Sequence, residues 1–219
     1  MRSRTRIKIC GLTREADVAA AVEAGVDAVG FVLYAKSPRR VNLQQAAALA
    51  RSVPPFVTPV LLFVNAAAAD IAAALAAVPH ALLQFHGDET PAACDAAGRP
   101  YLRAVGMAPG LDLLDFAHRF SNAQALLLDA AVDGWGGGGK VFDWSLIAPD
   151  LPADVRSRLV LSGGLNPANV IDGVLHARPF AVDVSSGVES AKGIKDAALM
   201  RRFCEAVREA DARLADIAT

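Results

Sequence analysis

Short, strongly apolar runs recur along the whole chain and are separated by longer stretches of helical character. The runs are rich in Val, Ile, Leu and Phe and alternate poorly with polar residues, which is typical of strands covered on both faces. The runs are Arg6–Cys10, Ala28–Leu33, Val57–Val64, Ala81–Phe85, Tyr101–Val105, Ala125–Asp129, Leu159–Leu161 and Phe180–Val184. The pattern therefore predicts eight short, buried β-strands.

The stretches between these runs predict helices. Several have residues that favour helix starts, such as Asn42 and the pair Asn166 and Pro167, or helix ends, such as Gly25 and Gly98. The predicted helices are Thr13–Ala24, Leu43–Ser52, Ala67–Ala77, Glu89–Ala97, Leu111–Phe120, Trp144–Ile147, Asn166–Ala177 and Asp196–Asp211. Strands that alternate with helices in this way predict an α/β fold with a parallel sheet.

Such a sheet either stays open, as in a doubly wound fold, or closes into a (β/α)8 TIM barrel. Eight strand–helix units favour closure, and so does the absence of G-x-G-x-x-G after the first strand. The length of 219 residues suits one barrel domain over residues 1–219, and a hydrophobic fraction of 53% supplies its core. We therefore expect a single TIM barrel.

Composition excludes several classes of protein. The formal net charge of −1 gives no reason to expect nucleic acid or an anionic membrane surface as a partner. No run of about 20 uninterrupted apolar residues occurs, and the apolar run after the basic start is too short for a secretion signal. The odd number of cysteines (Cys10, Cys94 and Cys204) and the lack of C-x-x-C argue against disulfides or a cysteine zinc site. We expect a protein of the reducing cytoplasm that has no metal and no cofactor.

Polar residues follow the carboxyl ends of most predicted strands, which is where TIM barrels carry their active sites. The seventh strand is followed by Ser162-Gly163-Gly164, and the eighth by Ser185-Ser186-Gly187. Glycine-rich turns let backbone N–H groups face an anion, and the loops after strands 7 and 8 are the usual phosphate site of this fold. We predict that these two loops bind a phosphate group.

Closure of the barrel would place the ends of strands 1 and 6 on opposite sides of this phosphate site. Cys10 ends strand 1, and Asp129 ends strand 6. A thiol and a carboxyl group on either side of a bound sugar phosphate can serve as base and acid in a proton-transfer isomerisation. The pattern predicts a phosphosugar isomerase, although the fold alone also fits a phosphosugar-binding barrel without catalysis.

The chain also resembles the phosphoribosylanthranilate isomerase family from residue 8 to residue 189. The matching segments follow the family order and are Lys8–Thr13, Gly30–Arg39, Gln84–Gly87, Leu127–Asp129, Gly136–Trp144, Leu161–Asn169 and Val182–Glu189. The resemblance implies a cofactor-free Amadori rearrangement of a small phosphosugar substrate. It implies Cys10 as general base, Asp129 as general acid and Arg39 as the contact for the anthranilate carboxylate.

Four further polar residues are assigned to the neighbourhood of this site. Gln84 and His86 point the same way from strand 4 and either line the pocket or hydrogen-bond its wall, and Asp183 is expected to line the site. Lys8 lies two residues before Cys10 on the same strand face, so it is either a paired structural charge or a cation that favours the thiolate. The leucines before Asp129 suggest a desolvated setting that would raise its pKa.

Some positions depart from the family pattern, and some relatives on the same scaffold stay possible. Gly138 and Val141, in the segment Gly136–Trp144, stand where the family has hydroxyl residues. Ala35 replaces proline, and Phe85 stands where leucine is common. The histidine-pathway aldose–ketose isomerase would need aspartate at Cys10, and indole-glycerol-phosphate synthase would need an extended N-terminus and a catalytic lysine. Tryptophan synthase α subunit is the remaining alternative.

For the oligomeric state of the protein, we expect a monomer or a homodimer.

Overall fold

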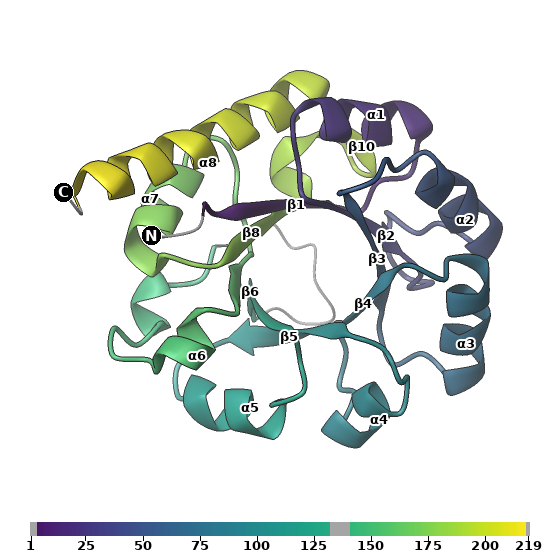
Figure 1. Cartoon of the computed structure of the whole chain (residues 1–219), viewed down its shortest axis with the longest axis horizontal. Helices are drawn as coiled ribbons and strands as arrows, with labels where there is room; N and C mark the ends of the chain where they lie inside the picture. The colour runs from purple at the N-terminus through teal and green to yellow at the C-terminus, as the bar shows by residue number, and fades with distance from the viewer. Residues whose placement is uncertain (1–3, 132–140, 218–219) are drawn as a thin grey trace.

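Eight parallel strands close into a barrel in chain order, because β1 pairs with β8 as well as with β2. The computed structural model describes residues 4–131 and 141–217. Figure 1 shows the ring of strands with the helices around its outside. The strands are β1 (Arg6–Cys10), β2 (Ala28–Val32), β3 (Thr58–Phe63), β4 (Leu82–Phe85), β5 (Tyr101–Met107), β6 (Ala125–Ala130), β7 (Leu159–Leu161) and β8 (Ala181–Val184). The predicted TIM barrel is confirmed.

The helices follow the strands closely, and α2 begins at its expected cap. Asn42 accepts a hydrogen bond from Gln45 N at 2.8 Å and its own N–H donates to the Gln45 side chain, so a capping box starts α2. The α-helices are α1 (Glu15–Glu23), α2 (Leu43–Arg51), α3 (Ala68–Ala77), α4 (Pro91–Asp95), α5 (Leu113–Arg119), α6 (Ala153–Arg156), α7 (Val170–Ala177) and α8 (Ala197–Ile217). None of the helices in these described ranges is long and apolar enough to cross a membrane.

The region between β6 and β8 differs from the prediction. Residues Trp144–Leu146 form only a 3-10 turn, η1, and the short helix α6 was not predicted. Helix α7 starts at Val170 and not at Asn166, because Asn166 and Asn169 first close a separate turn: Asn166 Oδ1 accepts from Ala168 N, and Asn169 Oδ1 accepts from Asn166 N. Side-chain hydrogen bonds of this kind compete with the helix and delay its start.

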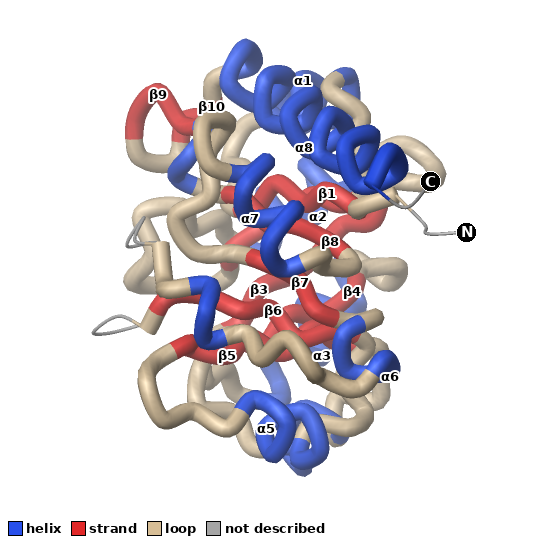
Figure 2. The backbone as a smooth tube through the Cα atoms, turned by 90° about the vertical axis from the view of Figure 1, so that its left-hand side faces the viewer, coloured by secondary structure: helices blue, strands red, loops and turns tan. Residues whose placement is uncertain are grey.

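A small element between β8 and α8 was also missed. A 3-10 turn, η2 (Ser186–Val188), leads into an antiparallel hairpin of β9 (Glu189–Ala191) and β10 (Ile194–Lys195). Figure 2 shows this hairpin projecting beside the barrel, next to the start of α8. Its strands are too short for a hydrophobic period to reveal them.

Apolar side chains fill two zones of the barrel. Along β1, Ile7 and Ile9 join the large cluster between strands and helices, whereas Lys8 and Cys10 point into the barrel. The apolar part of the interior is filled by Val60, Leu102, Ala104, Ala125, Leu127, Val160 and Ala181. The polar interior side chains lie further toward the carboxyl ends of the strands, so the chemistry of the molecule is concentrated at that end.

Candidate active site

A cavity of about 330 Å³ opens at the carboxyl ends of the barrel strands. Every predicted site residue except Gly187 lines it; these are Cys10, Arg39, Gln84, His86, Asp129, Ser162, Gly163, Gly164, Asp183, Ser185 and Ser186. Apolar side chains complete the wall, among them Val32, Tyr34, Leu62 and Val64. A cavity lined by both polar and apolar side chains suits a ligand that has both an ionic group and an aromatic or aliphatic part.

Cys10 ends β1 with its side chain buried in the barrel. Burial is the main cause that raises the pKa of its thiol above the ordinary value, and the Lys8 ammonium opposes this rise. Lys8 itself pairs with Asp183, with Nζ and Oδ1 2.9 Å apart and both side chains buried. Lys8 is therefore a paired interior charge, and its ammonium also opposes the rise in the pKa of Cys10.

Asp129 lies near the end of β6 and faces His86 at the end of β4. Asp129 Oδ2 is 3.2 Å from His86 Nε2, and Asp129 Oδ1 accepts from the N–H of Ala130 at 2.8 Å. Gln84 Nε2 lies 3.1 Å from His86 Nδ1. His86 thus contacts Gln84 through one ring nitrogen and Asp129 through the other.

Arg39 lines the cavity with its guanidinium already engaged. Its Nε and Nη2 donate to the two carboxylate oxygens of Glu189 at 2.7 and 2.9 Å. Glu189 also accepts from the ammonium of Lys195 at 2.8 Å. Sequence reasoning assigned no role to Glu189 or Lys195, although Glu189 ends a segment quoted for the resemblance and Lys195 follows it closely.

The two predicted phosphate loops lie against each other. A Cβ built on Gly187 would lie 1.9 Å from the carbonyl oxygen of Leu165, so only glycine permits this approach of the two backbones. Gly163 and Gly164 have φ values of +76° and +63°. Within the described part of the chain, their N–H groups donate to no acceptor. Free N–H groups in a tight glycine turn suit an anion.

The structure also bears on the departures from the family pattern, on metal binding and on the cysteines. Gly138 lies outside the described residues, whereas Val141 is exposed and Phe85 is buried in the core. Among residues 4–131 and 141–217, no group of three or more His, Cys, Asp or Glu side chains is arranged to hold a metal ion. The three cysteines are free and buried.

The chain is similar to known proteins in family and in sequence. Residues 7–206 match the model of the N-(5'-phosphoribosyl)anthranilate isomerase family. A relative from Methylibium petroleiphilum, named N-(5'-phosphoribosyl)anthranilate isomerase, is 76% identical over 212 residues, which are 97% of this chain and 98% of the relative.

Solved structures agree with these matches. A phosphoribosyl anthranilate isomerase from Thermotoga maritima is 39% identical with a TM-score of 0.82, and the match covers 94% of this chain and 99% of that one. A second such structure, in complex with reduced 1-(o-carboxyphenylamino)-1-deoxyribulose 5-phosphate, is 37% identical with a TM-score of 0.79 and the same coverage. With family, sequence and fold in agreement over nearly the whole chain, this protein is an isomerase that belongs to the N-(5'-phosphoribosyl)anthranilate isomerase family.

Proposed function

We propose that this chain converts N-(5'-phosphoribosyl)anthranilate into 1-(2-carboxyphenylamino)-1-deoxyribulose 5-phosphate, with Asp129 as general acid and Cys10 as general base. The reaction belongs to tryptophan biosynthesis, which is the role of the family. The observation that carries the proposal is a single cavity lined by Cys10, Asp129 and the two glycine-rich loops. A family member bound to a reduced form of this ketose phosphate supports the choice of substrate.

Each end of the substrate has a matching group in the cavity. The free N–H groups of Gly163 and Gly164, together with Ser185 and Ser186, would hold the phosphate. Arg39 would meet the anthranilate carboxylate, and the apolar wall around Val32 would face the aromatic ring. The ribose would then lie between the acid and the base.

Asp129 would act first, by giving its proton to the ring oxygen of the ribose. The bond between that oxygen and C1 breaks, and the nitrogen lone pair forms the C=N bond of a protonated Schiff base. Thiolate Cys10 would then remove the C2 proton; the electrons of that C–H bond form the C1=C2 bond of an enolamine, and the C=N electrons return to nitrogen. Tautomerisation, in which the C2 hydroxyl loses its proton and C1 gains one, yields the ketone.

The proposal is tested by turnover of freshly generated N-(5'-phosphoribosyl)anthranilate, followed by loss of its fluorescence. Cys10→Ala and Asp129→Asn should each lower kcat by roughly 100- to 10,000-fold, the range expected when a general base or acid is lost. Cys204→Ala, at a buried cysteine of α8, and Asp150→Asn, at an exposed carboxylate, serve as matched controls.

Three outcomes are informative. Inactive wild type on intact substrate would overturn the assigned reaction and favour a binding barrel. A fully active Cys10→Ala would mean that another group removes the C2 proton. A fully active Asp129→Asn would mean that another group protonates the ring oxygen.

We also propose that the protein works in the cytoplasm and is a monomer or a homodimer. Sedimentation of the purified protein distinguishes the monomer from the homodimer.

A further inference from the structure

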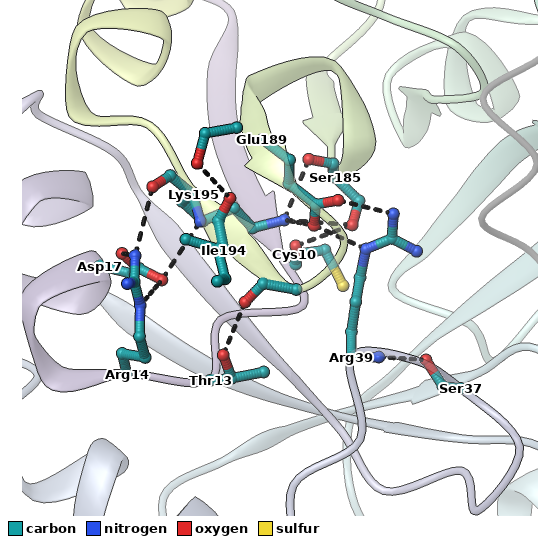
Figure 3. Close-up of polar contacts among 12 residues, drawn as sticks. Cys10, Thr13, Arg14, Asp17, Ser37, Arg39, Ser185, Glu189, Ile194 and Lys195 are labelled. Atoms are coloured by element: carbon teal, nitrogen blue, oxygen red, sulfur yellow. Dashed lines mark hydrogen bonds and ion pairs between the residues drawn. The ribbon is translucent and has the colours of Figure 1, made fainter.

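Three buried side chains form an ion cluster at the edge of the cavity, shown in Figure 3. Glu189, at the start of β9, lies between Arg39 and Lys195, the last residue of β10. Lys195 Nζ and Arg39 Nε both contact Glu189 Oε1, at 2.8 and 2.7 Å. The three side chains are at most 7% exposed. A carboxylate shared by two cations in such a buried setting has little freedom to move.

The Lys195 ammonium also binds the loop after β8, and through that loop it is connected to the first strand. Its Nζ donates to the carbonyl oxygen of Ser185 at 3.0 Å, and the Ser185 hydroxyl donates to the carbonyl oxygen of Cys10 at 3.0 Å. One side chain thereby connects the Arg39–Glu189 pair with the loop after β8 and with the end of β1.

The backbone of the hairpin is also held by Thr13, in the loop between β1 and α1, and by helix α1. Thr13 Oγ1 donates to the carbonyl oxygen of Gly193 at 2.7 Å, and the N–H of Lys195 donates to Asp17 Oδ2 at 3.3 Å. In Figure 3, Asp17 lies on the opposite side of Lys195 from Arg39. Replacement of the Lys195 side chain should therefore leave the hairpin in place while it removes one of the two cations bound to Glu189.

The cluster leaves only one edge of the guanidinium for a ligand. Glu189 occupies the Nε and Nη2 side of Arg39, while Nη1 donates to no acceptor among the described residues. The aliphatic stem of Arg39 is confined as well, because a Cβ on Gly11 would lie 2.5 Å from its Cδ. The Nη1 and Nη2 end of the guanidinium is thus the edge that stays available to a substrate.

Building on the proposed contact between Arg39 and the anthranilate carboxylate, we propose that Glu189 and Lys195 are positioning residues that aim this one edge of Arg39 at that carboxylate. They would determine the preference of the enzyme for an aromatic amine that carries an ortho carboxylate. Burial alone would raise the pKa of Glu189, but hydrogen bonds from Arg39 and Lys195 outweigh it and hold this pKa below the ordinary value. Glu189 is therefore ionised at neutral pH and keeps both cations paired.

The test compares two substrates that differ only in the carboxylate: N-(5'-phosphoribosyl)anthranilate and N-(5'-phosphoribosyl)aniline. Formation of each ketose is followed by NMR. Glu189→Gln should lower kcat/KM for the anthranilate compound by about 10- to 100-fold, the factor that corresponds to one lost charge-assisted hydrogen bond. The value for the aniline compound should stay within about threefold of wild type, since that substrate has no group for Arg39 to hold.

Further variants distinguish a change in the orientation of Arg39 from a change in the net charge of the cluster and from a loss of protein stability. Glu189→Gln with Lys195→Met removes one negative and one positive charge together, so the net charge of the cluster is kept while Arg39 loses its partner. We expect the same loss of preference in this double variant. Lys195→Met alone keeps the Arg39–Glu189 pair, so its preference for the anthranilate compound should fall by less than that of Glu189→Gln. It can still be measured if Glu189→Gln does not fold. Glu205→Gln, on the exposed face of α8, is the control.

The possible failures are distinguishable. A parallel fall on both substrates, or no change on either, in Glu189→Gln and in the double variant would overturn the positioning role. Arg39→Met should remove the preference completely; if it does so while the Glu189 and Lys195 variants keep the preference, only the positioning role fails. An unchanged preference in Arg39→Met, or an inactive wild type, would instead overturn the proposed function on which the inference depends.

Discussion

Lys8 and Asp183 form an ion pair inside the barrel, at paired positions of the adjacent strands β1 and β8. Lys8 Nζ lies 2.9 Å from Asp183 Oδ1. Burial is the main cause that raises the pKa of the nearby Cys10 thiol; Lys8 lowers this pKa, and Asp183 adds to the rise. The pair therefore adjusts the proton affinity of the proposed base, which is why it matters for the pH dependence of activity.

Replacement of Lys8 by Met should shift the acid limb of the kcat/KM pH profile to higher pH. A thiolate base is lost as pH falls through the Cys10 pKa, and a higher pKa moves that loss to higher pH. Since Lys8→Met leaves a lone buried carboxylate, Lys8→Met with Asp183→Asn is measured beside it and should shift in the same direction by less. Arg201→Met, at an exposed position of α8, controls for net charge. An unmoved limb in both variants would limit Lys8 to a structural role.

Replacement of His86 by Ala should lower kcat/KM by about tenfold to a hundredfold, less than the loss of a general acid. The reason is that Asp129 Oδ2 loses its neighbour at 3.2 Å, so the carboxyl group is no longer held toward the substrate. His86→Gln should recover part of the loss, because its amide can still donate a hydrogen bond. Steady-state kinetics would be compared with His80→Ala, an exposed histidine away from the cavity. Wild-type rates in His86→Ala would contradict this role.

Replacement of Gly187 by Ala should raise KM by about tenfold or more, the factor for one lost hydrogen bond to a charged group. The added Cβ would lie 1.9 Å from Leu165 O and would force the two proposed phosphate loops apart. Competition by inorganic phosphate should weaken in parallel with KM. Gly106→Ala is the matched control, because its Cβ would meet its nearest neighbour at an ordinary 3.6 Å. Equal phosphate competition in the two variants would argue against a phosphate site here.

Replacement of Asp27 by Asn should lower the free energy of unfolding at neutral pH by about 1 kcal/mol. Burial alone would raise the pKa of Asp27, but hydrogen bonds from Arg4 and the N–H of Ile7 outweigh it and lower this pKa. A carboxylate whose pKa is lowered on folding stabilises above its unfolded pKa, and this contribution is lost as pH falls through the folded pKa. The deficit of the variant should therefore shrink in acid.

Denaturant unfolding at a series of pH values measures this effect. Asp150→Asn, which changes an exposed carboxylate, should show no comparable pH-dependent deficit. A deficit of Asp27→Asn that stays constant down to pH values below about 3.9, the ordinary pKa of aspartate, would contradict the ionic origin of the effect.

Much of the site follows from local pattern. Apolar runs mark the strands, and the fold brings their carboxyl ends to one end of the barrel. The sequence alone therefore predicts that Cys10, Asp129 and the two glycine-rich loops lie at one cavity, and all of them contribute to its lining. The hairpin β9–β10 could not be assigned in this way, because strands of three and two residues are too short to show a period.

By itself, the sequence determined the order of strands and helices and the residue types at the strand ends, because these depend on periodicity and on local turn chemistry. Only the tertiary structure decided which charges meet. Lys8 and Asp183 are separated by 175 residues, and Arg39 and Glu189 by 150. Closure of the barrel between β1 and β8 brings Lys8 and Asp183 together, and the hairpin after β8 carries Glu189 to Arg39. A buried charge needs a partner wherever the fold provides one, and sequence spacing does not reveal that partner.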